Sequence, residues 1–322
     1  MEKKIFSCVL IGLGDIGLNY DLHKDQNKYI QTHARAFSVN SGFNLLAGVD
    51  INNNACNVFT KKYSTESFNK IEDALLKIKP DLVIIAVPTI NQLESIKKIV
   101  NCYSPKVILC EKPMGGDYKQ GSKILNICNK NEIRLFVNYV RRSLPASKEI
   151  KKRIHENLIN TPMKSVIWYS KGLSHNGSHF INLMEYWFGK CLEIKIIDNG
   201  RQFETFGFEP YVILKFKNCE LTLIPAWEEF YSHYTIEIVS ASGRLYWGQK
   251  NLKWTKVNTS KGLKNHNFLS EISEEIATGS EKYQMHAANE LYLAMLGQSN
   301  SLSNGDDALE TLRIIDSILS KG

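Results

Sequence analysis

The sequence predicts an α/β protein with an N-terminal doubly wound parallel sheet and a C-terminal α+β domain with a large, mostly antiparallel open sheet. Up to about residue 140, short continuous apolar segments alternate with helical segments, which is typical of a parallel sheet covered on both faces. Beyond that point, strands of alternating polarity follow one another at short turns. We therefore expect two domains, residues 1–140 and residues 141–322, with a C-terminal helix that can pack back on the first domain.

Length, charge and cysteine usage narrow the class of protein. The 322 residues suit two domains, and the formal net charge of +7 suits an anionic small molecule. The densest basic stretch, Arg141 to Arg153, lacks interleaved aromatic residues, so we interpret it as a solvated helix face and expect no nucleic-acid partner. The seven cysteines form no CxxC pair, which indicates a reducing, cytoplasmic location without a zinc site. No apolar run reaches the ~18 residues that a membrane span needs.

A glycine motif follows the first expected strand, Ile5 to Ile11. Gly12-Leu13-Gly14-Asp15-Ile16-Gly17 has the GxGxxG spacing, whose glycines allow a tight turn, a close approach of a pyrophosphate and close packing. The second strand ends in Asp50, an acid suited to a ribose diol and unfavourable to a 2′-phosphate. The sequence therefore predicts a dinucleotide-binding first domain that takes NAD, with NADP as the alternative. The predicted cofactor-binding residues are Gly12, Gly14, Asp15, Ile16, Gly17, Asp50, Val87, Pro88, Thr89, Glu111 and Lys112.

The distance between these two features is unusual. Asp50 lies 38 residues after Gly12, farther than a standard unit needs, and the polar segment Leu18 to Ile30 lacks helical periodicity. We interpret it as an insertion, after which the helix resumes around Thr32 to Val39. A lid, an oligomer contact and plain surface decoration are the three alternatives for it.

A second chemical feature stands at the end of the strand Val107 to Cys110. There the apolar run changes abruptly to Glu111-Lys112-Pro113. Ligands of open α/β sheets lie outside the carboxyl ends of the strands, and Pro113 restricts the corner that carries Lys112. Lys112 is therefore a candidate catalytic residue, and a solvated strand-end turn is the alternative.

A polar cluster opens a helix expected over His175 to Gly189. His175 and His179 are four residues apart and Asn182 is three further on, so on one helix they would share a face. Core or capping histidines are one interpretation and a zinc site another, but the spacing offers no third ligand, so we expect no metal. A polar helix start after a glycine-bearing loop favours a substrate site that includes Asn176.

Together these features resemble the glucose-fructose oxidoreductase, inositol dehydrogenase and rhizopine-catabolism family (Gfo/Idh/MocA). The resemblance rests on Gly12 to Gly17, Ala86-Val87-Pro88, Cys110 to Pro113, Asn138 to Arg142, the His179 helix that closes in Trp187-Phe188-Gly189, and Asp306 to Glu310. It implies a Rossmann domain, NAD(P)-dependent chemistry on a sugar, sugar nucleotide or cyclitol, and a homodimer or homotetramer through the C-terminal sheet. Substrate binding and oligomerisation would then belong to residues 141–322.

The resemblance also implies roles for single residues. The family lysine maps to Lys112, with a cis peptide before Pro113, and the family histidine maps to His179. Three positions depart from the pattern: His175 and Asn182 replace aspartates, and Gln92 replaces a histidine. The predicted substrate-binding residues are Tyr139, Arg141, Asn176 and Asn182.

The expected chemistry is hydride transfer between the nicotinamide and a carbinol or ketone carbon. His179 would accept the hydroxyl proton, Lys112 would supply positive charge, and His175 would relay a proton. The alternative is a cofactor-binding, non-catalytic sensor or transcriptional regulator. The replaced aspartates favour this alternative, and the retained Lys112 and His179 oppose it.

Overall fold

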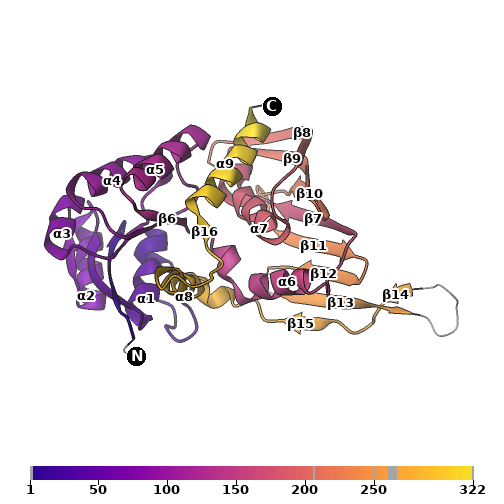
Figure 1. Ribbon diagram of the computed structural model, residues 1–322, viewed down its shortest axis with the longest axis horizontal. Coiled ribbons are helices and arrows are strands. Elements are labelled where there is room, and N and C mark those ends of the chain that lie inside the picture. The colour runs from indigo at the N-terminus through magenta and orange to yellow at the C-terminus, as the bar shows by residue number, and fades with distance from the viewer. Residues whose placement is uncertain (1–2, 206, 250, 260–266, 321–322) are drawn as a thin grey trace. The chain divides into compact units, whose positions relative to one another are not determined.

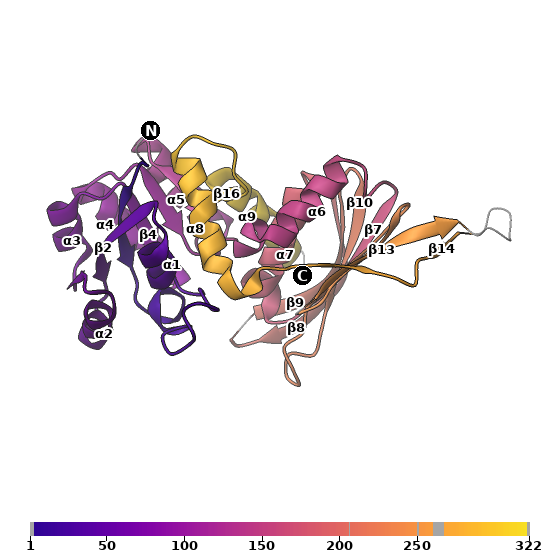
Figure 2. The same cartoon turned by 90° about the horizontal axis from the view of Figure 1, so that it is seen from below.

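The computed structural model describes residues 3–205, 207–249, 251–259 and 267–320, which form two compact units (Figures 1 and 2). The first unit comprises the chain up to Ser143 together with Glu281–Leu312. The second comprises Leu144–Ser280 and the chain from Arg313 onward. The C-terminal helix α9 therefore contributes its first part to one unit and its last part to the other.

The first unit is a seven-stranded sheet in the order β16-β6-β5-β4-β1-β2-β3. All neighbouring strands are parallel except β16, which runs antiparallel to β6. Its strands are β1 (Phe6–Ile11), β2 (Phe43–Val49), β3 (Glu66–Phe68), β4 (Leu82–Ile85), β5 (Val107–Cys110), β6 (Arg134–Val137) and β16 (Ser303–Asn304). Its helical segments are η1 (Asp15–Asn19), α1 (His33–Val39), α2 (Asn53–Tyr63), α3 (Ile71–Ile78), α4 (Thr89–Cys102), α5 (Tyr118–Lys130), η2 (Val140–Ser143), α8 (Tyr283–Met295) and the start of α9 (Gly305–Leu319).

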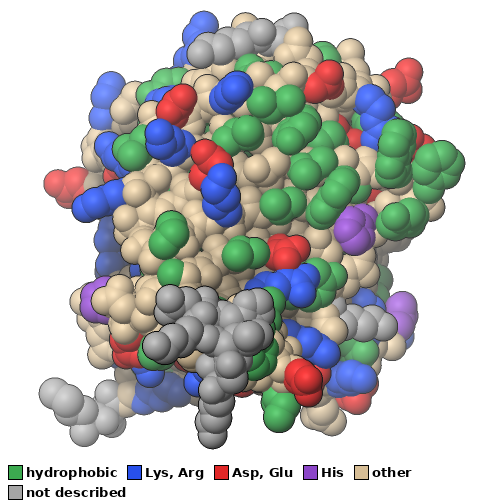
Figure 3. Space-filling model, turned by 90° about the vertical axis from the view of Figure 1, so that its right-hand side faces the viewer, with side chains coloured by type: hydrophobic (Ala, Val, Ile, Leu, Met, Phe, Trp, Pro, Cys, Tyr) green, Lys and Arg blue, Asp and Glu red, His purple; other side chains and the backbone are tan. Residues whose placement is uncertain are grey.

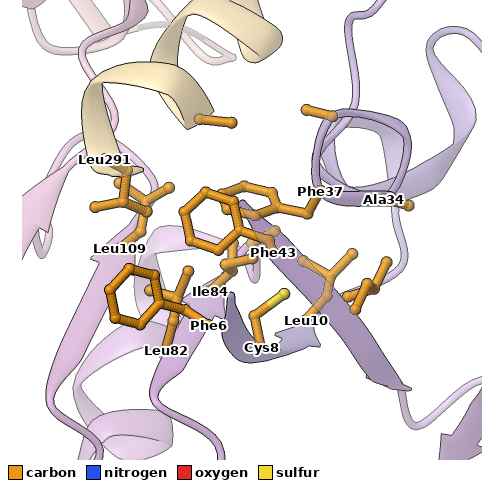
Figure 4. Packing of buried hydrophobic residues seen from close by; sticks show 14 of the residues in the cluster. Phe6, Cys8, Leu10, Ala34, Phe37, Phe43, Leu82, Ile84, Leu109 and Leu291 are labelled. Carbon is orange, nitrogen blue, oxygen red and sulfur yellow. The ribbon is translucent and has the colours of Figure 1, made fainter. Parts of the chain in front are cut away.

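Apolar side chains cover both faces of this sheet, which explains the continuous hydrophobic strands. Alternate residues of β1, Cys8 and Leu10, pack with α1 and α8 on one face, where Phe37 and Leu291 lie in the same cluster (Figure 4). The intervening residues, including Val9, pack with α3, α4 and α5 on the other face. The carboxyl ends of the parallel strands consequently lie along one edge, where the loops carry the polar residues.

The second unit is a nine-stranded sheet in the order β14-β13-β12-β11-β7-β10-β9-β8, with β15 paired to β13. Its neighbours are antiparallel except for β7 and β10, which are parallel. The strands are β7 (Met163–Tyr169), β8 (Glu193–Phe203), β9 (Gly207–Lys215), β10 (Cys219–Pro225), β11 (Thr235–Ser240), β12 (Gly243–Trp247), β13 (Leu252–Thr259), β14 (Asn267–Leu269) and β15 (Glu274–Ile276). The helical segments are α6 (Pro145–His155), η3 (Gly172–Gly177), α7 (Ser178–Phe188) and η4 (Ser280–Lys282), which ends in the first unit. The predicted architecture of two different sheets is confirmed.

The two faces of this second sheet differ. Helices α6 and α7 lie on one face (Figure 2). Figure 3 shows hydrophobic side chains gathered among charged ones on the side turned toward the viewer. Exposed apolar residues on the strands include Trp168 on β7 and Val239 on β11. An apolar, helix-free face of this kind is a surface that another chain can cover.

The interpretation of Arg141 to Arg153 as a solvated helix face is wrong for two of its arginines. Arg142 is buried in the first unit and forms an ion pair with Asp307 at 3.0 Å. Arg153, in the second unit, donates to both carboxylate oxygens of Glu274 at 2.8 and 2.6 Å. Acidic partners distant in sequence hold these side chains, so local periodicity could not reveal them. In the part of the chain that the structure describes, no helix has the length and apolar character needed to cross a membrane.

Candidate functional site

The carboxyl edge of the first sheet forms a cavity of about 610 Å³. Its walls come from the loops after β1, β2, β3 and β4, from the first turn of α3 and from the first three turns of α4. The lining residues are Ile11, Gly12, Gly14, Val49, Asp50, Ile51, Asn69, Lys70, Ile71, Glu72, Ala86, Val87, Pro88, Asn91, Glu94, Ser95 and Lys98. Five predicted cofactor-binding residues, Gly12, Gly14, Asp50, Val87 and Pro88, therefore meet at one site.

The glycines of the motif meet three different demands. Gly12 has φ +97°, and a Cβ there would come within 2.5 Å of the carbonyl oxygen of Ala86. A Cβ on Gly17 would lie 2.1 Å from the carbonyl oxygen of Gly12. Around Gly14, by contrast, no atom lies within 4 Å of the Cβ position, so the backbone is open to a ligand. This arrangement fits the pyrophosphate of a dinucleotide, which needs unobstructed backbone N–H groups.

Asp50 connects this loop to the second strand. Its Oδ2 accepts a hydrogen bond from the backbone N–H of Leu13 at 2.8 Å, and its Oδ1 accepts one from that of Asn52 at 2.8 Å. Each carboxylate oxygen can accept a further hydrogen bond, so the side chain can still receive a ribose hydroxyl. Asp50 thus holds the glycine loop as well as facing the cavity.

The structure distributes the other predicted cofactor residues differently. Asp15, Ile16, Gly17, Thr89, Glu111 and Lys112 do not line the cavity. Sequence reasoning missed Asn69 and Lys70, which follow the short strand β3, and Lys98 on α4. Recognising β3 as a parallel strand beside β2 would have predicted Asn69 and Lys70, because they follow its carboxyl end. With three residues, however, β3 is too short to show a periodicity in the sequence.

Lys112 occupies the corner after β5 and is half-buried, beside the buried Glu111. Its peptide bond to Pro113 is cis, as the family resemblance implies. The pKa of Lys112 is lowered from 10.5 to about 8, chiefly by burial and also by the charge of Arg141, against the raising effect of the Glu111 carboxylate. An amine with such a pKa changes its charge within the working range of an enzyme.

Gln92 fixes the main chain of this corner. Its Nε2 donates to the carbonyl oxygen of Glu111 at 2.8 Å, and its Oε1 accepts from the N–H of Gly115 at 2.8 Å. One fully buried amide therefore bridges both ends of the segment that carries Lys112. At the position where the family resemblance implies a histidine, the structure gives Gln92 a bridging contact.

The inserted segment is tied to its own unit. The buried Asp21 accepts hydrogen bonds from the N–H groups of Gln31 and Thr32 at 2.6 and 3.1 Å and from the Thr32 hydroxyl at 2.8 Å. Its carboxylate also lies 3.5 Å from Nε of the buried Arg35. The N–H of Ile30 donates to the carbonyl of Glu281, just before α8. These contacts argue against a lid. The helix resumes at His33, with Thr32 as its N-cap, as predicted.

In the second unit, His175 and His179 lie on different segments. His175 is exposed in the π-helical turn η3, whereas His179 is half-buried in the first turn of α7. The expected helix is present but irregular: η3 runs directly into α7 with right-handed backbone at Gly177 and Ser178, and only the turn that carries His175 is π-helical. The chain enters η3 through left-handed backbone at Lys171 and Gly172. The buried Glu209 holds this entry by accepting the Gly172 N–H at 3.0 Å.

The predicted substrate-binding residues fall in both units. Tyr139 and Arg141 follow β6 in the first unit, where Tyr139 is buried and Arg141 half-buried. In the second unit, Asn176 donates to the carbonyl of Ser170 at 3.0 Å, and Asn182 is fully buried on α7. Among the described residues, no group of three or more His, Cys, Asp or Glu could hold a metal ion.

Solved structures share this architecture along nearly the whole chain. An oxidoreductase from Desulfitobacterium hafniense, provisionally described as NADPH-dependent, matches with a TM-score of 0.80 at 15% identity, over 100% of this chain and 96% of that one. The WlbA dehydrogenase from Bordetella pertussis, in complex with NADH and UDP-GlcNAcA, matches with 0.74 at 12% identity, over 100% and 96%. An oxidoreductase from Agrobacterium radiobacter, in complex with NAD+, L-tartaric acid and magnesium, matches with 0.73 at 14% identity, over 98% and 97%.

Sequence comparison adds the family. A search of curated proteins finds no match. A family model described as "Oxidoreductase family, NAD-binding Rossmann fold", for GFO_IDH_MocA, matches residues 6–139. This range contains the glycine motif, the Ala86-Val87-Pro88 strand end and the Lys112 corner, which are three of the features on which the resemblance rests. Residues 6–139 therefore form an NAD(P)-binding Rossmann domain of the Gfo/Idh/MocA oxidoreductase family.

Proposed function

We propose that the protein transfers hydride between a nicotinamide cofactor and a carbinol or ketone carbon of a sugar, sugar nucleotide or cyclitol. The observation that carries the proposal is the carboxyl edge of the first sheet. There, an open glycine loop and Asp50 share a cavity, and a half-buried lysine with a lowered pKa follows β5. A perturbed lysine at this edge is a feature of active sites.

The cofactor, when bound, supplies or accepts the hydride. In the oxidative direction, His179 accepts the proton of the substrate hydroxyl, because imidazole is a base in the neutral pH range. The Lys112 ammonium stabilises the negative charge that develops on the oxygen. His175 relays the proton toward solvent, since it is exposed on η3. Tyr139, Arg141, Asn176 and Asn182 contact the substrate.

NAD(H) is the proposed cofactor. The Asp50 carboxylate would repel the 2′-phosphate of NADP(H). Two backbone N–H groups hold this carboxylate in place at the cavity wall. Lys70 and Lys98 also line the cavity, so NADP(H) binds more weakly rather than not at all. The exposed apolar face of the second sheet supports assembly into a homodimer or homotetramer.

The complexes of two structural relatives support the substrate class. One of them holds NADH with UDP-GlcNAcA, a sugar nucleotide, and another holds NAD+ with L-tartaric acid, a hydroxy acid. Both ligands carry the carbinol carbon that the proposed chemistry needs. A non-catalytic sensor on the same scaffold is the second candidate, which the replaced aspartates at His175 and Asn182 favour.

A panel of sugars, sugar nucleotides, cyclitols and hydroxy acids tests the proposal. NADH formation or consumption is followed at 340 nm with the wild type, His179→Ala and Lys112→Met. We expect each variant to lose about 10²-fold or more in kcat/KM, while the NADH affinity of His179→Ala stays near that of the wild type. Two-fold or smaller losses in both variants on a turned-over substrate would refute the assigned roles. NADH binding without turnover of any panel member would favour the sensor.

A further inference from the structure

The Glu111 carboxylate has no role in the proposed chemistry, yet it is buried and bonded to two buried side chains of the first unit. It follows β5 directly and is 9% exposed. His33 Nε2 lies 2.7 Å and Asn138 Nδ2 lies 2.6 Å from the same oxygen, Oε1. Asn138 Nδ2 also donates to Oε1 of Gln284 at 3.0 Å, and His33, Asn138 and Gln284 are each 1% exposed. An ionised carboxylate is well satisfied in such a place, because both neighbours can donate.

The groups of this cluster come from separate parts of the first unit, with His33 and Asn138 bonded to Glu111 and Gln284 bonded to Asn138. His33 is the first residue of α1, Asn138 directly follows β6, and Gln284 lies in the first turn of α8. Burial raises the pKa of Glu111, but the hydrogen bond and the charge interaction with His33, the hydrogen bond of Asn138 and the charge of Lys112 together outweigh burial. The pKa therefore lies below its ordinary value. Glu111 is thus negatively charged at neutral pH, with its position fixed by two donors.

The insertion has a place in this arrangement. Asp21, inside the inserted segment, accepts hydrogen bonds from the N–H groups of Gln31 and Thr32, the two residues before His33. The buried Arg35, two residues after His33, forms an ion pair with the same Asp21 carboxylate. These contacts fix the backbone before and after His33 in the first turn of α1. The His33 ring is therefore held in the position from which it contacts Glu111.

We propose that His33 and Asn138 are positioning residues that hold the Glu111 carboxylate as a fixed counter-charge, which keeps Lys112 an ammonium at neutral pH. The inserted segment serves this arrangement by fixing His33. The inference rests on the proposed role of Lys112 for its importance to turnover, but the charge of Lys112 can be measured without any substrate.

The charged and titratable groups around the pair define the expected direction. Glu111 raises the pKa of Lys112, whereas burial and Arg141 lower it. The hydroxyls of Tyr20 and Tyr283 also feel the Glu111 charge, but their pKa values are raised above 10 by burial, so both stay neutral in the relevant range. Without the Glu111 charge, burial and Arg141 remain, and both lower the pKa of Lys112. Lys112 should therefore lose its proton at a lower pH.

Competitive labelling of the full-length apoprotein with trace acetic anhydride measures this directly. The acetylation of the Lys112 peptide is followed by mass spectrometry from pH 6 to pH 10, and its midpoint gives the pKa of that lysine. In Glu111→Gln we expect the midpoint to fall by about one pH unit or more, because a nearby opposite charge is worth that much. In His33→Ala we expect a smaller fall in the same direction, and His33→Gln, which retains a donor, should restore the midpoint.

Phe37→Leu is the matched control. Phe37 is buried on α1 and its ring stacks near that of His33, but it makes no hydrogen bond to Glu111. It should lower stability while leaving the Lys112 midpoint unchanged. If a substrate is found, the alkaline limb of kcat should move to lower pH in His33→Ala, with the Kd for NADH unchanged.

Two results would overturn the inference. An unchanged midpoint in Glu111→Gln would show that Glu111 is no counter-charge for Lys112. A fall in Glu111→Gln with no change in His33→Ala would remove His33 from the arrangement. Failure of the proposed function gives a different pattern, in which Lys112→Met keeps its turnover whatever the labelling midpoints are.

Discussion

Replacing Lys112 with methionine should make the protein more stable at neutral pH while abolishing its proposed activity. The pKa of Lys112 is lowered from 10.5 to about 8, chiefly by burial. That difference corresponds to about 3 kcal/mol between the two protonation states. Methionine is unbranched, apolar and close in length to the lysine stem, so it can fill the same space without a charge.

The pH dependence of this effect has a defined sign. Below pH 8 the amine is protonated in both the folded and the unfolded chain, and the full cost of its burial is present. Between pH 8 and 10.5 the folded state loses the proton first, so the wild type gains stability relative to the variant as the pH rises. We expect Lys112→Met to be about 1–3 kcal/mol more stable at pH 7, because the variant no longer buries a charge whose cost, net of the attraction of Glu111, the lowered pKa of Lys112 reports. The difference should nearly vanish above pH 10.5.

The assay must report on the first unit. All five tryptophans lie in the second unit, so their fluorescence is the wrong probe. Hydrogen exchange of the β5 peptide, together with urea unfolding followed by circular dichroism, measures the relevant free energy. Lys77→Met is the control, since Lys77 is exposed and paired only with the exposed Glu66 among the ion pairs of the described residues. A lower stability of Lys112→Met at pH 7, or a difference that does not change with pH, would refute the reasoning.

Three further predictions follow from the first unit. Gly12→Ala should lower stability by about 1–3 kcal/mol in urea unfolding, because its φ is +97° and its Cβ would clash with backbone, whereas Gly14→Ala should keep its stability and lose NADH affinity in fluorescence titration. Asp21→Ala should cost about 3–5 kcal/mol in the same unfolding assay, because it leaves Arg35 buried without its carboxylate; a loss below 1 kcal/mol would contradict this. Asp50→Asn should raise the affinity for NADPH relative to NADH by about 10-fold in competition titrations, since it removes one charge near a 2′-phosphate; an unchanged ratio would mean that Asp50 does not discriminate.

Local sequence signals predicted the first sheet well because each of them acts over a few residues. Each pattern reflects a requirement of a few neighbouring residues, either for burial or for a backbone conformation. This holds for the continuous apolar strands, the glycine motif and the acid at the end of β2. The structure brings these features to one cavity because parallel strands share a carboxyl edge. The Lys112 corner was found in the same way, as an abrupt change from apolar to charged residues at the end of a strand.

Signals failed where the chain departs from regular geometry or relies on distant partners. The helix expected from His175 begins as a π-helical turn that continues into α7, and Glu209 on β9 accepts a hydrogen bond from the first residue of that turn, Gly172. No periodicity in the segment itself encodes that contact. The buried state of Arg142 likewise depends on Asp307, which lies far away in the sequence.

The sequence by itself determined the fold class, the family of the first domain and the chemical identity of Lys112, since these depend on residue type and short spacing. Only the tertiary structure decided how that lysine is held. His33 and Asn138 reach Glu111 from different elements, and Gln92 bridges the two ends of the corner from α4. Hydrogen bonds between buried groups are set by where separate elements pack, so no local pattern in the sequence could have paired them.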